Sequence, residues 1–196
     1  MENLKETYNK LAPKWNQADW GDKGLRKFIK LISGGKVLDL GCGSGIQSKV
    51  LQEAGLEVVG VDFAEKMIEE AKKRVPNAEF LVMDILNLDF PPEHFDGIYA
   101  RASLLHIPKN KIGQVLKDLH KILKRNGIIY VALKEGEGER EVVDEDLGAS
   151  RFFAFYKEDE IRELLEKMGF QIIETVYEKT KNNLWLQIFA NKRQTA

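Results

Sequence analysis

The sequence predicts an α/β protein built on a doubly wound, mostly parallel sheet with helices on both faces. Short apolar runs alternate with stretches of helical periodicity, which is typical of strand–helix–strand units. A glycine-rich segment joins the first apolar run to the helix that follows it. Two apolar runs near the end are separated only by a short polar turn, which predicts that the last strand runs antiparallel to the rest.

Five apolar runs are expected to form the parallel strands: residues 36–40, 56–61, 79–83, 97–100 and 128–133. The helices between them are predicted from apolar residues that recur every three or four positions. One helix covers residues 46–54, a second carries Met67 and Ile68, and a third starts its apolar stripe at Ile112. The third is expected to end at Asn126-Gly127, a pair that favours a helix C-terminus.

The two ends of the chain lie outside this alternation. Residues 1–24 carry an apolar and aromatic stripe and are expected to form a helical arm before the sheet. Residues 135–150 are rich in acids and glycine without periodicity, which predicts a long surface loop. A helix over residues 157–168 and strands over 171–177 and 184–190 complete a seven-stranded sheet.

Composition excludes several classes of protein. The chain has 196 residues, with 30 Lys and Arg against 31 Asp and Glu, a balance that disfavours a dedicated nucleic-acid binder. One cysteine permits no internal disulfide, and three scattered histidines make no metal site. Residues 1–14 lack the apolar core of a signal peptide, and no apolar run is long enough to span a bilayer. We therefore expect a cytoplasmic protein that binds neither metal nor membrane.

The glycine-rich segment carries the strongest functional signal. It reads Val-Leu-Asp-Leu-Gly-Cys-Gly-Ser-Gly over residues 37–45, directly before a helix. Glycine lets a ligand approach the backbone, and a helix N-terminus offers free N–H groups. The dinucleotide fingerprint fails, because its third glycine position holds Ile46 or Ser48, and no Gly-Lys-Ser/Thr follows for a phosphate loop.

The pattern Asp-x-Gly-x-Gly-x-Gly from Asp39 to Gly45 resembles the class I S-adenosylmethionine-dependent methyltransferases, in particular the small type 11 and type 25 domains. The resemblance extends from about Tyr8 to the end of the chain. It implies a Rossmann-like seven-stranded sheet whose last strand is antiparallel, in agreement with the expected hairpin. It also implies one domain over residues 1–196, with an arm or lid over 1–34, a cofactor-binding half over 35–134 and a substrate side over 135–196.

Three segments are expected to hold S-adenosylmethionine. A carboxylate at Asp39 can attract the ammonium group of the methionine part, directly or through water. The loop lies against the methionine and the ribose, through Gly41, Cys42, Gly43 and Gly45. Asp62 ends the second strand, where a carboxylate can accept both ribose hydroxyls, although an aspartate there can also cap the next helix.

Further residues are assigned through the resemblance. Phe63 and Met67 would flank the adenine, with core packing as the alternative for Met67. Asp84, with Ile85 beside it, would face the adenine amino group, unless it only shapes a turn. Ala100 and Arg101 would lie near the methionine part. Asp96 begins a strand, away from the expected ligand, and is interpreted as structural.

The acceptor side is expected at the end of the fourth strand. His106 is the candidate general base, because its ordinary pKa lies near neutrality; the alternative is a histidine that caps a helix or holds a backbone carbonyl. An aromatic and basic set is expected to wall the substrate pocket, with core packing as the alternative: Tyr8, Trp15, Trp20, Arg151, Phe153 and Tyr156.

These features predict methyl transfer to a small molecule by a monomer or homodimer. Enzymes that methylate the amino groups of nucleic-acid bases carry Asn/Asp-Pro-Pro-aromatic after the fourth strand. This chain has Arg101-Ala102-Ser103-Leu104 there, which disfavours that class. An RNA methyltransferase and a noncatalytic subunit that binds the cofactor without turnover remain the alternatives. A nucleotide oxidoreductase is disfavoured by the failed glycine spacing.

Overall fold

The computed structural model describes residues 2–17, 23–144, 149–180 and 183–193. The chain opens with helix α1 (Glu2–Leu11), the 3-10 turn η1 (Ala12–Gln17) and helix α2 (Lys23–Ile32). The first half of the sheet region contains β1 (Lys36–Leu40), α3 (Ile46–Glu53), β2 (Glu57–Asp62), α4 (Glu65–Arg74), β3 (Glu79–Val82) and η2 (Ile85–Asn87). It continues with β4 (Phe95–Arg101), η3 (Leu104–His106), α5 (Lys109–Ile122) and β5 (Leu123–Lys134). The last part contains β6 (Glu139–Asp144), β7 (Ala149–Ala154), α6 (Glu158–Lys167), β8 (Phe170–Lys179) and β9 (Leu184–Lys192).

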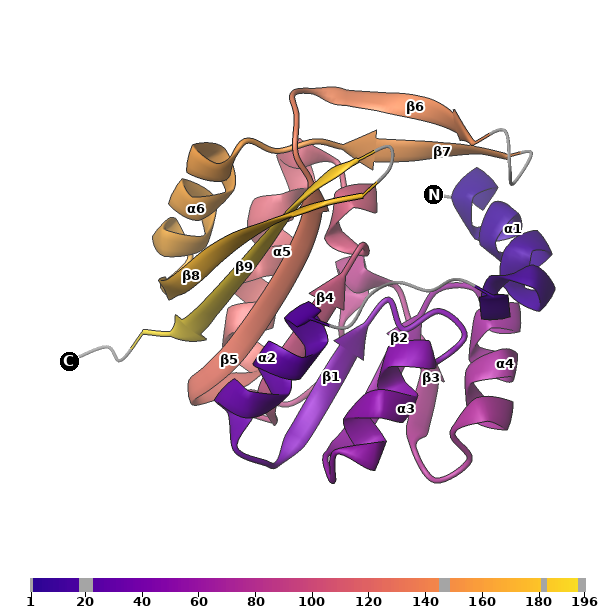
Figure 1. Ribbon diagram of the computed structural model, residues 1–196, viewed down its shortest axis with the longest axis horizontal. Helices are drawn as coiled ribbons and strands as arrows, with labels where there is room; N and C mark the ends of the chain where they lie inside the picture. The colour runs from indigo at the N-terminus through magenta and orange to yellow at the C-terminus, as the bar shows by residue number, and fades with distance from the viewer. Residues whose placement is uncertain (1, 18–22, 145–148, 181–182, 194–196) are drawn as a thin grey trace.

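The main sheet has the predicted architecture. Within the described residues it has seven strands in the order β3-β2-β1-β4-β5-β9-β8 (Figure 1). Strand β1 pairs in parallel with β2 on one side and β4 on the other, whereas β9 pairs antiparallel with both β5 and β8. The antiparallel last strand is therefore confirmed, and it is inserted between β5 and β8. The strand order reverses at β1 and β4, which is where ligands bind in open α/β sheets.

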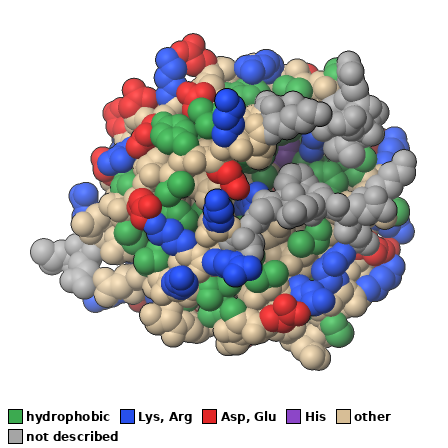
Figure 2. Space-filling view, viewed as in Figure 1, with side chains coloured by type: hydrophobic (Ala, Val, Ile, Leu, Met, Phe, Trp, Pro, Cys, Tyr) green, Lys and Arg blue, Asp and Glu red, His purple; other side chains and the backbone are tan. Residues whose placement is uncertain are grey.

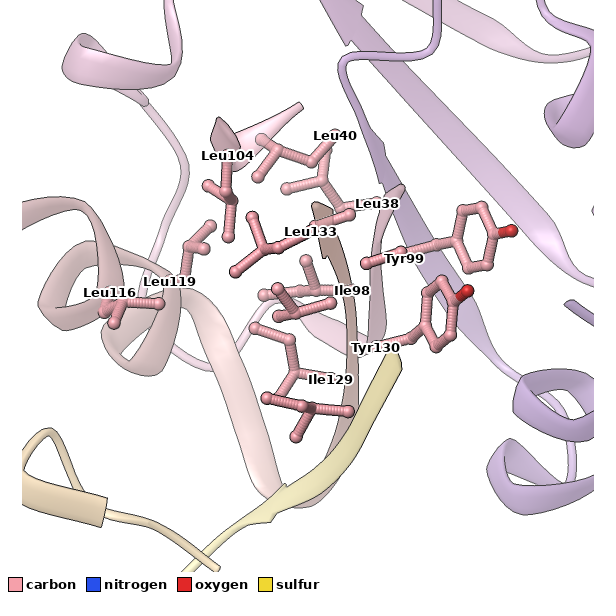
Figure 3. Close-up of a cluster of buried hydrophobic side chains, with 14 of the residues drawn as sticks. Leu38, Leu40, Ile98, Tyr99, Leu104, Leu116, Leu119, Ile129, Tyr130 and Leu133 are labelled. Atoms are coloured by element: carbon pink, nitrogen blue, oxygen red, sulfur yellow. The ribbon is translucent and has the colours of Figure 1, made fainter. Parts of the chain in front are cut away.

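Helices cover both faces of the sheet, because strands buried on both sides need two apolar layers. Helices α2, α3 and α4 lie on one face, and α5 lies on the other with α6 beside β8 (Figure 1). Side chains alternate between these layers along each strand. Figure 3 shows Tyr99 and Tyr130 stacked on one side of the sheet and Ile98 and Ile129 on the other.

The predicted loop over residues 135–150 is wrong. Strands β6 and β7 pair antiparallel as a separate two-stranded ribbon, with Glu139 opposite Ala154 and Val143 opposite Ser150. The ribbon extends across the carboxyl ends of the main strands (Figure 1). Its outer face has no core to contact, so charged residues occupy strand positions there and the period of two that marks a half-buried strand is lost. Arg140 of β6 is opposite Phe153 of β7, and its guanidinium lies 3.7 Å from the ring of Phe155, just after β7.

The predicted end of the third helix is also wrong. Helix α5 ends at Ile122 rather than at Asn126-Gly127, because Leu123 leaves the helix and pairs with Phe95 of β4. Leu123 is fully buried, so sheet packing overrides the local signal. Asn126 does adopt a positive φ of 60°, but inside β5.

The N-terminal arm is helical, as expected, and it packs on the sheet domain. Helix α1 contacts α4 and β7, so it reaches from the cofactor half to the ribbon. Leu11 and Ala12 are buried against Ala64 and Met67. No helix in the described part of the chain is long and apolar enough to cross a membrane.

The close approach of β2 and β3 yields a stability prediction. A Cβ on Gly60 would lie 2.5 Å from the Phe80 ring and 3.0 Å from the Cys42 sulfur, in a packed interior. We expect Gly60→Ala to lower the free energy of unfolding by about 1–3 kcal/mol, measured by urea denaturation. Gly113→Ala in α5 is the control, because a Cβ there has nothing within 4 Å. It should raise stability by up to about 1 kcal/mol, and an equal loss in both variants would contradict the packing argument.

Candidate functional site

A pocket opens where the carboxyl ends of β1, β2 and β4 meet under the arm. Its empty space is about 830 Å³, measured out to open solvent. Its floor comes from the glycine loop and strand ends, and its cover includes Tyr8 and Trp15 of the arm. Figure 2 shows a hollow on this face of the molecule, with a histidine side chain visible inside it. The site therefore lies at the topological switch point of the sheet.

The glycine loop needs its glycines for close approach. Gly41 has a φ of 73°, and a Cβ there would lie 2.5 Å from the Ser103 Cβ. Gly45 precedes α3 with a φ of 77°, and a Cβ there would lie 3.1 Å from Ala71 of α4. Side chains at these positions would push apart β1, α4 and the turn after β4. Gly41 and Gly43 line the pocket, whereas Gly45, also expected at the cofactor, packs against α4 and does not line it.

Asp62 connects the glycine loop to the end of β2. One of its carboxylate oxygens accepts the Gly43 N–H at 3.1 Å and the other accepts the Ala64 N–H at 2.9 Å. It lines the pocket although it is only 7% exposed. Burial raises its pKa to about 6, even though these backbone bonds favour the charged form. The side chain thus fixes the loop and the start of α4 while it faces the pocket.

Asp39 lies beneath the loop rather than in the pocket wall. It is 3% exposed, it is not among the residues that line the pocket, and it accepts a hydrogen bond from the Ser48 hydroxyl. Burial raises its pKa to about 7, and the neighbouring Asp62 charge adds to this rise. Among the described residues, no Lys, Arg or His nitrogen lies within 4 Å of the carboxylate of Asp39 or Asp62. Two buried carboxylates therefore lie at the loop without a cation.

The pocket brings together the residues expected on the adenine side. Phe63, Met67, Asp84 and Ile85 all line it. Met67 is fully buried against the arm, so it also belongs to the core. Asp84 accepts the Leu86 N–H at 2.9 Å and caps η2, which is the turn role foreseen as its alternative. These residues therefore lie together at one pocket wall.

Of the two residues expected at the ligand from the end of β4, only one lines the pocket. Arg101 lines the pocket, whereas Ala100 is fully buried and does not. Asp96, at the other end of the strand, binds Lys124 and the Lys36 N–H, which agrees with its structural interpretation. The strand therefore presents a cation at its carboxyl end and a structural anion at its start.

His106 lies in the pocket wall with both ring nitrogens engaged. Its Nδ1 is 2.7 Å from the Phe152 carbonyl oxygen of β7, and its Nε2 is 2.7 Å from the Tyr8 hydroxyl of α1. Burial lowers its pKa to about 4, and the charges of Arg151 and Lys134 act in the same direction. His106 is therefore neutral at pH 7, and it joins the arm to the ribbon.

The expected substrate residues divide into three groups. Tyr8 and Trp15 line the pocket, with their rings edge to face at 5.5 Å, and Trp20 lies outside the described residues. Arg151, Phe153 and Tyr156 do not line it. Arg151 stands behind Tyr8, with its Nη1 3.4 Å from the Tyr8 oxygen, and Phe153 packs on the His106 ring at 4.9 Å. Tyr156 is buried with the Lys109 ammonium 4.6 Å from its ring.

The segment after β4 was expected to line the site, but no role was assigned to Ser103 within it. Its buried hydroxyl has no hydrogen-bond partner among the described residues, and it lines the pocket beside Gly41. Gln47, Leu4, Ala102 and Ile107 also line the pocket. Ser103 sits after a turn in which Ala102 has a φ of 54°, and a serine in a short turn carries no signal of its own in the sequence.

The geometry agrees with the comparisons to known proteins. Residues 37–127 match the family described as a methyltransferase domain. An uncharacterised methyltransferase of Schizosaccharomyces pombe is 30% identical over 196 residues, which cover 86% of this chain and 74% of that protein. The chain belongs to the class I methyltransferases. The cofactor of this family is S-adenosylmethionine, as the glycine loop predicted.

Other relatives resemble parts of this methyltransferase. Demethylmenaquinone methyltransferase of Thermotoga maritima is 32% identical over 111 residues, 56% of this chain and 48% of that protein. The chain spans about half the length of several curated relatives that it matches. The fold is similar to that of the Burkholderia thailandensis 1,6-didemethyltoxoflavin-N1-methyltransferase solved with its substrate and S-adenosylhomocysteine. The TM-score is 0.76 at 19% identity, with 98% of this chain and 88% of that one covered.

The residues of the pocket fit the family's cofactor. The orphaned Ser103 hydroxyl offers a polar contact, and the uncompensated carboxylates suit a ligand with a cationic amino group and ribose hydroxyls. No group of three or more side chains among the described residues is arranged to hold a metal ion.

The buried carboxylates predict how stability depends on pH. A carboxyl whose folded pKa lies above its unfolded value binds its proton more tightly when folded, so stability falls as pH rises between the two values. For Asp39 this window runs from 3.8 to about 7. Wild type should therefore lose stability relative to Asp39→Asn as the pH rises. We expect the difference in unfolding free energy to move by about 2–4 kcal/mol in favour of the variant from pH 4 to pH 8 without cofactor, measured by urea denaturation at each pH.

Asp96→Asn provides a control of opposite sign. Burial alone would raise the pKa of Asp96, but hydrogen bonds from Lys124 and the Lys36 N–H outweigh it and lower the pKa. This variant should lose stability at neutral pH, and the loss should shrink in acid. A pH-independent difference between wild type and Asp39→Asn would contradict the account of the buried carboxylate.

Proposed function

We propose that this protein transfers the methyl group of S-adenosylmethionine to a small-molecule acceptor. The observation that carries the proposal is the pair of buried carboxylates at the glycine loop with no cation beside them among the described residues. Burying a charge without a partner costs several kcal/mol, so the site is built for a ligand that offsets that cost. The proposal extends to a cytoplasmic monomer or homodimer.

Each side of the pocket has a distinct task. Asp62 and the loop backbone would hold the ribose, with Asp39 acting on the amino group from below through the loop or a water molecule. Phe63, Ile85 and Asp84 would enclose the adenine. Arg101 is suited to the carboxylate of the methionine part, because a guanidinium binds carboxylates with two parallel hydrogen bonds. When bound, the cofactor supplies an activated methyl group.

The enclosure of the acceptor side favours a small molecule. Tyr8 and Trp15 cover the pocket from the arm, while His106 and Ile107 close it from the turn after β4. A polymer would need an open groove at this position. The near balance of 30 basic and 31 acidic side chains gives no support to RNA binding. The demethylmenaquinone methyltransferase of Thermotoga maritima, named for a small-molecule substrate, supports this choice.

Ligand-dependent thermal unfolding tests the cofactor. At a hundredfold excess over the dissociation constant, S-adenosylmethionine or S-adenosylhomocysteine should add about 2.7 kcal/mol, which corresponds to about 5–10 °C in Tm for a domain of this size. NAD should cause no shift. Asp62→Asn should reduce the shift, because the ribose contact is lost.

Asp118→Asn, on the surface of α5, is the matched control and should keep the full shift. Absence of a shift with both sulfur nucleotides in wild type would contradict the proposal. A shift without methyl transfer to any acceptor would favour the noncatalytic alternative.

A further inference from the structure

The wall of the acceptor side is built from three distant segments that meet at one hydroxyl group. Tyr8 comes from α1, His106 from η3 and Arg151 from β7. The Tyr8 oxygen lies 2.7 Å from Nε2 of His106 and 3.4 Å from Nη1 of Arg151. Tyr8 and His106 both line the pocket, so this hydroxyl can contact a bound acceptor.

The direction of each hydrogen bond follows from the partners. A carbonyl oxygen only accepts, so Nδ1 of His106 carries the hydrogen that bonds to the Phe152 oxygen. Because the ring is neutral at pH 7, its Nε2 has no hydrogen and accepts one from the Tyr8 hydroxyl. The single hydrogen of Tyr8 therefore points at His106. Toward its other neighbours, including a ligand, the Tyr8 oxygen offers only lone pairs.

This arrangement selects the chemistry of the acceptor. A group that contacts the Tyr8 oxygen has to bring its own hydrogen, as a hydroxyl or N–H group does. We propose that Tyr8 and His106 form a proton relay for a hydroxyl-bearing small molecule, so that the protein methylates oxygen. This inference rests on the proposed function and names its acceptor class.

The relay can be written as a balanced step. A lone pair of the acceptor hydroxyl forms the new carbon–oxygen bond as the carbon–sulfur bond breaks, and that bonding pair stays on sulfur. The hydroxyl proton passes to the Tyr8 oxygen while the Tyr8 proton passes to Nε2 of His106. The positive charge that leaves sulfur is then on the imidazole ring. The Arg151 guanidinium beside the Tyr8 oxygen stabilises negative charge that develops there during the transfer.

The low basicity of His106 agrees with an oxygen acceptor. An oxygen that has just gained a methyl group is a strong acid, so even a weakly basic imidazole can take its proton. A methylated amine holds its proton more tightly than this ring does, and a thiol ionises without help. Burial and the nearby charges of Arg151 and Lys134 then favour loss of the proton from His106 to water when the product leaves. In this scheme Tyr8 contacts the acceptor, and His106 is the terminal base that takes the proton through Tyr8.

Nitrogen NMR of the histidine rings tests the relay without any acceptor. At pH 7, His106 should show the neutral form with hydrogen on Nδ1, and Tyr8→Phe should shift its Nε2 signal. Loss of one ring in His106→Gln assigns the signals. Tyr177→Phe is the control, because that hydroxyl binds Glu158 on the surface. A charged ring, or a hydrogen on Nε2, would overturn the proposal.

Matched probes test the acceptor class. With S-adenosylhomocysteine bound, phenol should shift the His106 Nε2 signal, whereas anisole, which has no hydroxyl hydrogen, should not. Phenol, aniline and thiophenol are then offered with S-adenosylmethionine, and methylation should be confined to phenol. Equal response to phenol and anisole, no response to phenol, or methylation confined to aniline or thiophenol would overturn the proposal.

Two variants separate positioning from proton transfer. Tyr8→Phe should lower kcat by about 10²–10⁴-fold on the hydroxyl acceptor, which is the usual contribution of acid–base groups. His106→Gln should lower kcat with little change in KM, because an amide oxygen can accept the Tyr8 hydrogen bond but cannot take the proton. Unchanged kcat in Tyr8→Phe would overturn the relay. The wild-type Tm shift with S-adenosylhomocysteine reports separately on the proposed function, so the two ideas can fail independently.

Discussion

Desolvation of two carboxylates is the constraint on which the site depends. Asp39 and Asp62 end neighbouring parallel strands, and the packing of the sheet removes both from water. Each keeps a hydrogen bond, to the Ser48 hydroxyl or to the Gly43 and Ala64 N–H groups, but none of these supplies a positive charge. The glycine loop is held in position by the same bonds. Loop geometry and affinity for a ligand that offsets the buried charge therefore have one origin.

The cover of the pocket depends on a second set of contacts. The His106 ring is hydrogen-bonded to the arm through the Tyr8 hydroxyl and to the ribbon through the Phe152 carbonyl. The apolar side of the arm packs on α4, next to the start of the cofactor pocket. The segments proposed to enclose the acceptor are thus attached to the segments proposed to hold the cofactor. This coupling places both parts of the pocket under one cover.

Prediction from the sequence succeeded where burial is two-sided and periodic. Strands β1 and β9 were foreseen because their residues are apolar and mostly buried, whereas the edge strand β8 was foreseen from the short polar turn that joins it to β9. The ribbon of β6 and β7 was missed because charged residues occupy its outer face. The end of α5 was misplaced because Leu123 pairs with Phe95 of β4 instead of continuing the helix. In both errors the decisive partner lies far along the chain. Within the site, the pocket contains Gly41, Gly43, Asp62 and Arg101 as expected, but not Asp39, Gly45 or Ala100.

The sequence by itself determined the sheet, the glycine loop and the carboxylates that follow the strands, because strand, turn and helix signals are local and their spacing is fixed by backbone geometry. It identified His106 as a candidate general base, but not which of its ring nitrogens carries the hydrogen. Tyr8 is 98 residues away from His106 and Phe152 is 46 residues away. Only the tertiary structure decided that one ring nitrogen donates and the other accepts, because hydrogen-bond direction depends on which partners the fold brings within 3 Å.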